Sequence, residues 1–199
     1  MNFIRYIRER NFRSDAAIRL NARRMEEFCR YEKDLRDKSI LEVGSGIGLL
    51  STWFIDRRFD VTLSDARVSH VKLLQKRFPD TPVILYDLRD CPTIEFDVVF
   101  CFGVLYHLEN PVQGVRHLDR LTKKILFLET LVAEKGEVNP TKENKYALDQ
   151  SLNGLGCRPG WDFLYRLLFN TFPIIHCHDY PHHEDYRERR RIMIRVEKQ

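Results

Sequence analysis

The stretch SILEVGSGIGLLSTWF, residues 39–54, places three glycines between two apolar segments. The first segment, ILEV, has the length and character of a buried strand, and residues 47–58 have the apolar density of a helix packed on a sheet. Gly44, Gly46 and Gly48 separate the two. Glycine at alternate positions lets the backbone turn sharply and admits a ligand close to main-chain N–H groups. The stretch therefore predicts a strand, a ligand-binding turn and a helix.

The composition predicts one domain with a single core. The chain has 199 residues, of which 43% are hydrophobic, enough for one substantial core. Its longest apolar run, residues 98–106, is far shorter than the ~20 residues that a membrane helix needs. Residues 1–15 carry charges where a signal peptide would have its apolar segment. We therefore expect a cytoplasmic protein with no membrane partner.

Positive charge is concentrated at the N-terminus. Residues 1–38 contain 11 Lys and Arg and 7 Asp and Glu, a net charge of +4. This equals the net charge of the whole chain, so the remaining residues are neutral overall. Such a segment can form a phosphate-facing patch for RNA. Its basic residues are interleaved with Glu26, Glu27, Glu32 and Asp34, so we favour a solvated helical face.

Strands and helices alternate along the chain after an N-terminal helix over residues 15–36, which Ser14 can cap. The predicted strands lie near residues 39–44, 60–65, 82–87, 96–102 and 123–129, and the helices near 47–58, 67–78 and 109–122. This alternation predicts a parallel sheet covered on both faces. Residues 172–181 and 189–198 add a hairpin. The fold class is thus a Rossmann-like, doubly wound α/β fold, with a mostly parallel seven-stranded sheet and an antiparallel C-terminal hairpin strand.

We divide the chain into an N-terminal helical cap, residues 1–38, and one compact domain, residues 39–199. Residues 133–160 are polar, rich in turn formers and without strong periodicity. They are interpreted as an irregular insertion between the fifth strand and the last helix, and such a long loop is typical of a lid.

The glycine turn excludes two common nucleotide-binding motifs. A dinucleotide fingerprint needs glycine or alanine at the position of Leu49, and a P-loop needs a Lys-Ser/Thr pair after the glycines. The remaining pattern is E-x-G-x-G-x-G with Glu42 at the strand end. It resembles motif I of the class I S-adenosylmethionine-dependent methyltransferases, and the resemblance covers residues 39–130 best.

The resemblance implies S-adenosylmethionine as the cofactor and assigns residues to it. Asp65, after the second strand, would grip the ribose hydroxyls, and Asp87 would meet the adenine amino group. Capping of the next helix is the alternative for Asp65, and turn chemistry shared with Asp90 is the alternative for Asp87. Glu42 would contact the methionine amino group directly or through water, or else lie at the positive end of the next helix. The full implied set is Glu42, Gly44, Ser45, Gly46, Gly48, Asp65, Ala66, Asp87, Leu88 and Cys101.

The family reaction is an in-line displacement at an activated methyl group, so the protein must align the acceptor and remove a proton. His107 lies where the fourth strand ends, next to Tyr106, and these two residues are the catalytic candidates. The alternative is a histidine that only packs or caps there. Cys101 is expected to contribute backbone and shape rather than thiol chemistry.

Metal ions are not expected in this site. The five cysteines are odd in number and lack CxxC spacing: Cys29, Cys91, Cys101, Cys157 and Cys177. A metal-assisted methyltransferase remains an alternative because of His176, His178, Asp179, His182 and His183. No carboxylate pair follows the fourth strand, as the metal-dependent catechol type would need.

We therefore expect O-methylation of a small molecule or sugar. The segment at residues 151–169 resembles part of small-molecule and sugar methyltransferases, and Arg158, Trp161 and Tyr165 could line an acceptor pocket or form an ordinary amphipathic helix. One alternative is a tRNA or rRNA methyltransferase that uses the basic N-terminal helix, and another is a catalytically silent cofactor-binding subunit. The sequence leaves the oligomeric state open.

Overall fold

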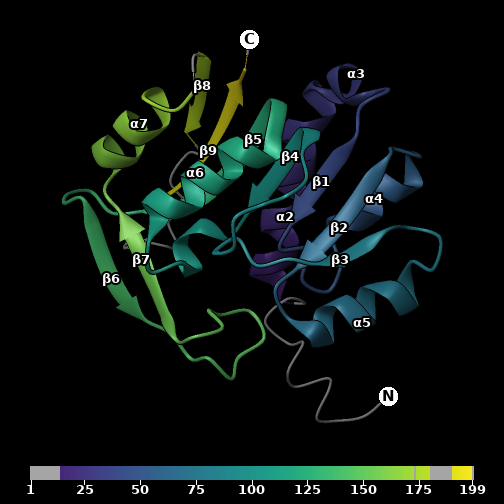
Figure 1. The fold of residues 1–199 in the computed structure, drawn as a ribbon, viewed down its shortest axis with the longest axis horizontal. Helices are drawn as coiled ribbons and strands as arrows, with labels where there is room; N and C mark the ends of the chain where they lie inside the picture. Colours follow the sequence, from purple (N-terminus) through teal and green to yellow (C-terminus); the bar gives the residue numbers. More distant parts are fainter. Residues whose placement is uncertain (1–13, 173, 180–189, 199) are drawn as a thin grey trace.

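The computed structural model describes residues 14–172, 174–179 and 190–198. Figure 1 shows the elements in chain order, and none of the helices in the described ranges is long and apolar enough to cross a membrane. The elements are α2 (Asp15–Arg30), α3 (Glu32–Leu35), β1 (Ile40–Val43), α4 (Ser51–Asp56), β2 (Val61–Asp65), α5 (Val68–Arg77), β3 (Val83–Leu85), β4 (Phe96–Phe102), the 3-10 turn η1 (Leu105–His107), α6 (Pro111–Leu121), β5 (Thr122–Val132), β6 (Val138–Lys142), β7 (Leu155–Pro159), α7 (Trp161–Phe169), β8 (Ile174–Asp179) and β9 (Arg190–Glu197).

The main sheet has the strand order β3-β2-β1-β4-β5-β9-β8 (Figure 1). Its first five strands are parallel, and β9 is antiparallel to both β5 and β8. The structure thus confirms the doubly wound, mostly parallel class with an antiparallel strand from a C-terminal hairpin. The chain leaves β1 for β2 on one side and returns to β4 on the other, and ligands bind at such a switch point.

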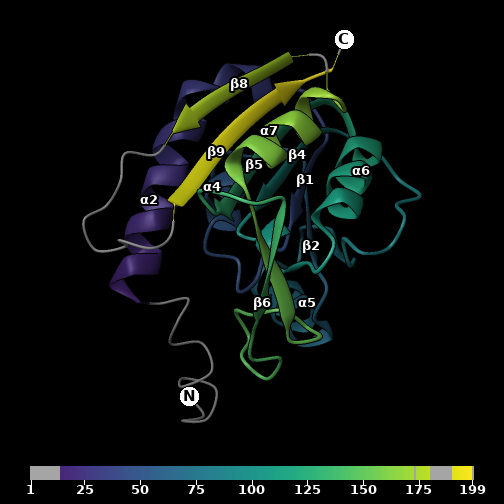
Figure 2. The ribbon, with the colours of Figure 1, turned by 90° about the vertical axis from the view of Figure 1, so that its left-hand side faces the viewer.

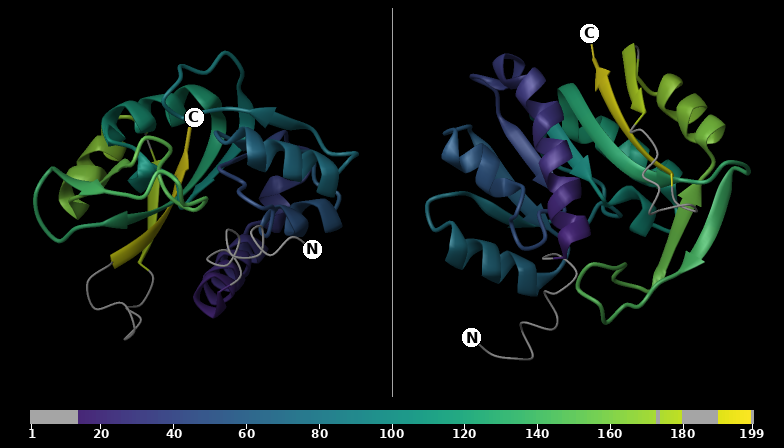
Figure 3. Two further views of the ribbon diagram at one scale, coloured as in Figure 1. Left: turned by 90° about the horizontal axis from the view of Figure 1, so that it is seen from below. Right: turned by 180° about the vertical axis from the view of Figure 1, so that it is seen from behind.

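Helices cover both faces of the sheet, as Figure 2 shows for α2 and α6. On one face, Phe28 of α2 and Phe54 of α4 pack against Phe100 and Phe127 of the sheet, with all four rings buried. The opposite face packs against α6 and α7 through a second apolar cluster. The view from behind in Figure 3 shows α2 lying across the strands. The N-terminal helix is therefore part of the hydrophobic core.

The N-terminal helix begins where the sequence predicts. The Ser14 side chain accepts a hydrogen bond from the Ala17 N–H at 3.2 Å, the cap expected at that position. The single helix predicted over residues 15–36 is wrong, because it divides at Tyr31 into α2 and α3. The helix predicted over residues 47–58 is shorter as well, since α4 begins only at Ser51. The glycine turn therefore continues to Leu50.

The insertion at residues 133–160 is not irregular throughout. It contains a two-stranded antiparallel ribbon of β6 and β7, paired from Val138 with Pro159 to Lys142 with Leu155. A bridge between Ala133 and Gly160 closes the ribbon at its base, where it joins the main fold. The ribbon lies beside the main sheet, and the segment that connects its strands extends across the end of the fold (Figure 1).

Candidate functional site

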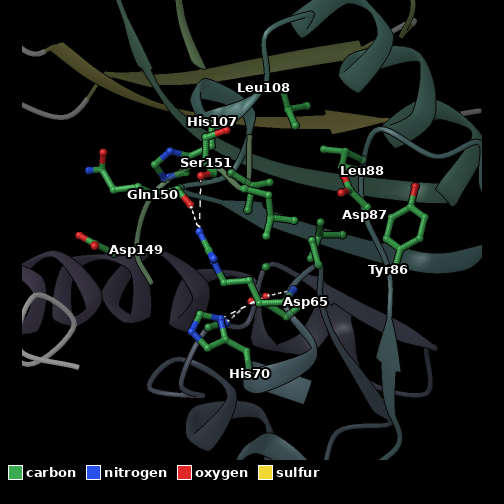
Figure 4. A pocket seen from close by; sticks show the side chains of 18 of the residues that line it. Asp65, His70, Tyr86, Asp87, Leu88, His107, Leu108, Asp149, Gln150 and Ser151 are labelled. Atoms are coloured by element: carbon green, nitrogen blue, oxygen red, sulfur yellow. Dashed lines mark hydrogen bonds and ion pairs between the residues drawn. The ribbon is translucent and has the colours of Figure 1, made fainter. Parts of the chain in front are cut away.

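A cleft opens at the carboxyl ends of β1 and β2, beside the end of β4, where the strand order reverses. Seven of the residues predicted from the sequence line it: Gly44, Gly46, Asp65, Ala66, Asp87, Leu88 and His107. Five others are not among its lining residues: Glu42, Ser45, Gly48, Cys101 and Tyr106. Figure 4 shows Asp65 and His70 in one part of the cleft, Tyr86, Asp87 and Leu88 in another, and His107 with Ser151 opposite Asp65.

The glycine turn after β1 needs glycine for two reasons. Gly44 and Gly46 have φ values of 73° and 58°, which side-chain-bearing residues rarely adopt. A Cβ atom at Gly44 would also lie 2.3 Å from Cγ2 of Val104. Gly48 is different, because the space beside its Cα is occupied by the ring of Phe78 rather than by the cleft. The first two glycines thus shape the cleft, and the third permits helix packing.

Asp65 fastens the glycine turn to the end of β2. One carboxylate oxygen, Oδ2, accepts a hydrogen bond from the Gly46 N–H at 2.9 Å. The other, Oδ1, accepts from the Arg67 N–H at 2.8 Å and lies 3.1 Å from Nδ1 of the buried His70. Arg67, not Asp65, is the N-cap of α5. A carboxylate has about four lone-pair positions, so Asp65 has room for about one further donor from the cleft, at Oδ2.

Asp87 and Leu88 form the side of the cleft beyond β3. Arg89 donates to both carboxylate oxygens of Asp87 through its guanidinium, with Nε 3.0 Å from Oδ1 and 3.1 Å from Oδ2. Burial opposes ionisation of Asp87, but the hydrogen bonds from Arg89 hold its pKa below the ordinary value. Leu88 is buried and presents an apolar surface to the cleft. Leu88 can therefore pack against a flat heteroaromatic ring, and the Asp87 carboxylate can accept a hydrogen bond from an amino group on that ring.

Glu42 and Cys101 lie beneath the cleft rather than in it. The Glu42 carboxylate is buried and accepts a hydrogen bond from the Ser51 hydroxyl at 2.5 Å. Burial raises the pKa of Glu42 to about 7. Ser45 donates its hydroxyl to the Glu42 carbonyl at 3.3 Å. Burial also raises the pKa of the Cys101 thiol, so this sulfur contributes packing.

His107 meets a carboxylate that the sequence did not reveal. Its Nδ1 lies 2.5 Å from Oε2 of Glu143, which belongs to the insertion. The same oxygen accepts the Ser151 N–H at 2.7 Å, and Arg158 lies 3.7 Å from the other oxygen. Burial opposes ionisation of Glu143, but the contacts with His107, the Ser151 N–H and Arg158 together hold the pKa of Glu143 below its ordinary value. An ionised carboxylate at Nδ1 keeps the proton of a neutral imidazole there and leaves Nε2 as the basic nitrogen.

The insertion closes over the cleft and is held by Arg67. Nη2 of Arg67 donates to the carbonyl oxygens of Ala147 and Gln150, both at 2.9 Å. Residues 148–152 line the cleft opposite the glycine turn. Dashed lines in Figure 4 lead to Gln150 and Ser151, whose carbonyl oxygens accept from Arg67. This part of the insertion therefore covers the cleft, as expected of a lid.

Tyr106 points away from the cleft. Nη2 of Arg191 lies 3.4 Å from the Tyr106 hydroxyl, and the guanidinium carbons of Arg158 and Arg191 lie 4.9 Å and 5.3 Å from the centre of its ring. Its ring also contacts that of His107, with the centroids 4.1 Å apart. Tyr106 therefore links His107 to a group of arginines.

The three residues predicted to line an acceptor pocket, Arg158, Trp161 and Tyr165, do not line this cleft. Trp161 packs against the apolar core, and the side chain of Tyr165 is 40% exposed on α7. Within the described residues no group of three or more His, Cys, Asp and Glu side chains could hold a metal ion. Of the histidine-rich stretch, His182 and His183 lie outside the described residues.

Sequence reasoning missed Arg67, His70 and Glu143. Arg67 and His70 follow Asp65 closely, so their position after a strand end was a usable signal. No sequence signal marks Glu143, because it lies in a polar segment with no periodicity. Only the folded chain brings it into contact with His107.

Residues 41–125 match the model of the family described as a methyltransferase domain. The chain is 30% identical over 145 residues to a ubiquinone biosynthesis O-methyltransferase of Rickettsia conorii, covering 61% of this chain and 50% of that protein. It is 29% identical over 100 residues to a tRNA U34 carboxymethyltransferase of Campylobacter lari, covering 46% and 33%. The chain spans half or less of the length of these two relatives.

The fold is also similar to that of a solved structure. This is the N-terminal domain of EvdMO1 in the presence of SAH and D-fucose, with a TM-score of 0.75. The two chains are 17% identical, and the similarity covers 90% of this chain and 83% of the other. At this identity the likeness concerns the fold.

Proposed function

We propose that this chain, which belongs to the class I S-adenosylmethionine-dependent methyltransferases, methylates a hydroxyl group of a small molecule or sugar. The observation that carries the proposal is the contact between His107 and Glu143 at the edge of the cleft, where Nδ1 of His107 lies 2.5 Å from Oε2 of Glu143. A hydroxyl acceptor is a poor nucleophile until its proton is removed, and a histidine held by a carboxylate is suited to that task.

The lining of the cleft fits S-adenosylmethionine. Gly44 and Gly46 line the cleft and carry no side chain, so the turn offers main chain where the methionine end would lie. Asp65 would accept hydrogen bonds from the ribose hydroxyls, with Ala66 beside it. Asp87 and Leu88 would contact the adenine. The bound cofactor supplies a methyl group activated by a sulfonium.

His107 would take the proton of the acceptor. During transfer of the methyl group that the cofactor would supply, the hydroxyl proton of the acceptor would pass to Nε2 of His107. The imidazolium then carries the positive charge, and the ionised Glu143 stabilises it. We assign Glu143 as a positioning residue, because it acts through His107.

The insertion would exclude water from the reaction. The carbonyl contacts of Arg67 hold residues 148–152 over the cleft, and Glu143 holds the same segment through Ser151. A covered site strengthens electrostatic interactions and protects the acceptor from competing solvent. Opening and closing of this segment would admit the acceptor.

The test is product identification. The full chain is incubated with methyl-labelled S-adenosylmethionine and a panel of hydroxylated small molecules, sugars and RNA, and the products are analysed by mass spectrometry. We expect the label on an oxygen atom of a small acceptor. Label on nitrogen or carbon, or only on RNA, would contradict this acceptor class. Binding of S-adenosylhomocysteine without turnover across the panel would favour a silent subunit.

RNA methylation is the second candidate, favoured by the similarity to a tRNA U34 carboxymethyltransferase. A polynucleotide acceptor makes several phosphate contacts, so its affinity falls steeply with salt. Binding of tRNA measured between 50 and 200 mM salt therefore separates the two. We expect weak binding that does not compete with small acceptors.

A further inference from the structure

We infer that Arg67 couples the two ends of the cleft, so that a cofactor bound beside Asp65 fixes the position of His107. The connection passes through Ser151 and Glu143, and Arg67 is therefore a positioning residue for the base. The inference rests on the proposed function, because it concerns regulation of the same site. It follows from one continuous set of contacts between the carboxyl end of β2 and the insertion.

Arg67 contacts the two sides of the cleft with different groups. Its main-chain N–H donates to Oδ1 of Asp65 at 2.8 Å, at the end of β2. Its side chain reaches the insertion, where Nη2 lies within hydrogen-bond distance of four main-chain carbonyl oxygens, those of Ala147 and Gln150 at 2.9 Å and those of Lys145 and Ser151 at 3.4 Å. The segment at residues 145–151 therefore wraps around one end of the guanidinium.

The guanidinium is the donor that allows these four carbonyl groups to face one point. Carbonyl oxygens repel one another, and a hydrogen bond from a charged donor is stronger than one from a neutral donor. Without this donor the carbonyl groups would turn toward water, and the segment at residues 145–151 would lose its conformation. Arg67 therefore decides whether this part of the insertion stays closed over the cleft.

Ser151 carries the effect of Arg67 to the base. The residue is buried, and its peptide groups face two partners: its carbonyl oxygen lies near Nη2 of Arg67, and its N–H donates to Oε2 of Glu143 at 2.7 Å. The same oxygen of Glu143 lies 2.5 Å from Nδ1 of His107. The direction of the carboxylate that holds the imidazole thus depends on the backbone at Ser151, and that backbone depends on Arg67.

A ligand in the cleft would contact both sides of this connection. Asp65 and Arg67 line the cleft on one side and residues 148–152 line it on the other, and Figure 4 shows Gln150 and Ser151 across the cleft from Asp65. A ligand that touches both sides binds the closed arrangement more tightly than one in which the second side has moved away. Binding therefore stabilises the closed segment by the factor that closure adds to the affinity. Cofactor loading in this way assembles the base.

Two measurements on the full chain test the inference without an acceptor, with S-adenosylhomocysteine as the probe. Hydrogen exchange followed by mass spectrometry reports the stability of residues 144–152. NMR with isotope-labelled histidine reports the Nδ1 proton of His107, assigned by its absence in His107→Gln. In the wild type, S-adenosylhomocysteine should slow exchange of this segment by about 5- to 150-fold, the usual range for coupled sites, and protect the Nδ1 proton from solvent.

Arg67→Gln removes the guanidinium but keeps the main-chain N–H that Asp65 accepts. S-adenosylhomocysteine should then protect neither the segment nor the Nδ1 proton of His107. Its affinity, measured by calorimetry, should fall by no more than the factor by which it slows exchange in the wild type. Arg67→Lys keeps a charged donor and should restore part of both signals.

Arg36 provides the matched control, because its guanidinium also donates to a main-chain carbonyl, that of Arg57 at 3.0 Å, and neither residue lines the cleft. Arg36→Gln should behave as the wild type does in both measurements. Wild-type signals in Arg67→Gln, or the same losses in Arg36→Gln, would overturn the inference.

The wild type alone separates this inference from the proposed function. Binding of S-adenosylhomocysteine with no change at residues 144–152 or at His107 would overturn the coupling and leave the cofactor site standing. Absence of S-adenosylhomocysteine binding would reject the cofactor site and the coupling together.

Discussion

The two ends of the cleft are built in different ways. At one end, Gly44, Gly46 and Asp65 come from the carboxyl ends of adjacent parallel strands, and hydrogen bonds between neighbouring loops hold them. At the other end, His107 depends on Glu143, which comes from an inserted ribbon 36 residues further along the chain. The first end follows from the sheet topology. The second exists only when the insertion has folded against the sheet.

This difference predicts a division of labour. The sheet end would hold the part of the reaction that all members of the family share, and the insertion end would select the acceptor and manage its proton. Changes at one end should therefore affect the function of the other less than their own, although Arg67 contacts both Asp65 and the insertion. The substitutions below are ordered by expected effect.

His107→Ala should have the largest effect. Loss of a general base slows turnover by roughly 10²–10⁴-fold, while the affinity for S-adenosylhomocysteine should hardly change, because the proposed base faces the acceptor. Initial rates, with calorimetry for the cofactor product, measure both.

Glu143→Gln is the matched variant, because it keeps the shape and removes the charge that stabilises the imidazolium. Turnover should fall less than in His107→Ala, and the affinity for S-adenosylhomocysteine should hardly change. Near-normal turnover in a well-folded His107→Ala protein would contradict the base role. A fall in thermal stability and cofactor affinity together would identify a structural histidine.

The sheet end was largely predictable because its signals are local. The apolar runs in the sequence predict β1, β2 and β4, and the structure contains these strands. Asp65 and Asp87 are predicted site residues because they follow predicted strands, and both line the cleft. Motif spacing could not tell lining residues from supporting ones. Successive side chains of β1 point to opposite faces of the sheet, and both faces are buried. The Glu42 carboxylate therefore lies beneath the cleft, in contact with Ser51, rather than in the cleft.

The insertion end was not predictable for a physical reason. β6 reads VNPTK and β7 reads LGCRP, and neither has the apolar alternation that marks a strand. The ribbon forms through backbone pairing and close approach: a Cβ atom at Gly156 would lie 2.5 Å from the Tyr106 carbonyl oxygen. Contacts of this kind depend on the assembled fold. The pair of His107 and Glu143 could not be inferred without them.

Glu42→Gln should change how stability depends on pH. Burial raises the pKa of Glu42 from 4.5 to about 7, so the folded protein keeps a proton that the unfolded chain releases. The free energy of unfolding should therefore fall as pH rises from about 4.5 to 7, by up to about 3 kcal/mol. Glutamine stays neutral and can keep the contact with Ser51. Urea unfolding at pH 5 and pH 7.5 should show a smaller difference in the variant, and an unchanged difference would contradict a buried, protonated Glu42.

Asp65→Ala should weaken binding of S-adenosylhomocysteine by roughly 10- to 100-fold, since each hydrogen bond to a charged group contributes about 1.5–3 kcal/mol and part of that is recovered by water. Asp65→Asn should weaken it less, because the amide oxygen can still accept the Gly46 N–H and hold the turn. The exposed Asp60, at the opposite end of β2, provides the control, and Asp60→Asn should bind normally. Calorimetry on folded variants measures all three. Unchanged affinity in Asp65→Ala would contradict a contact between Asp65 and the cofactor.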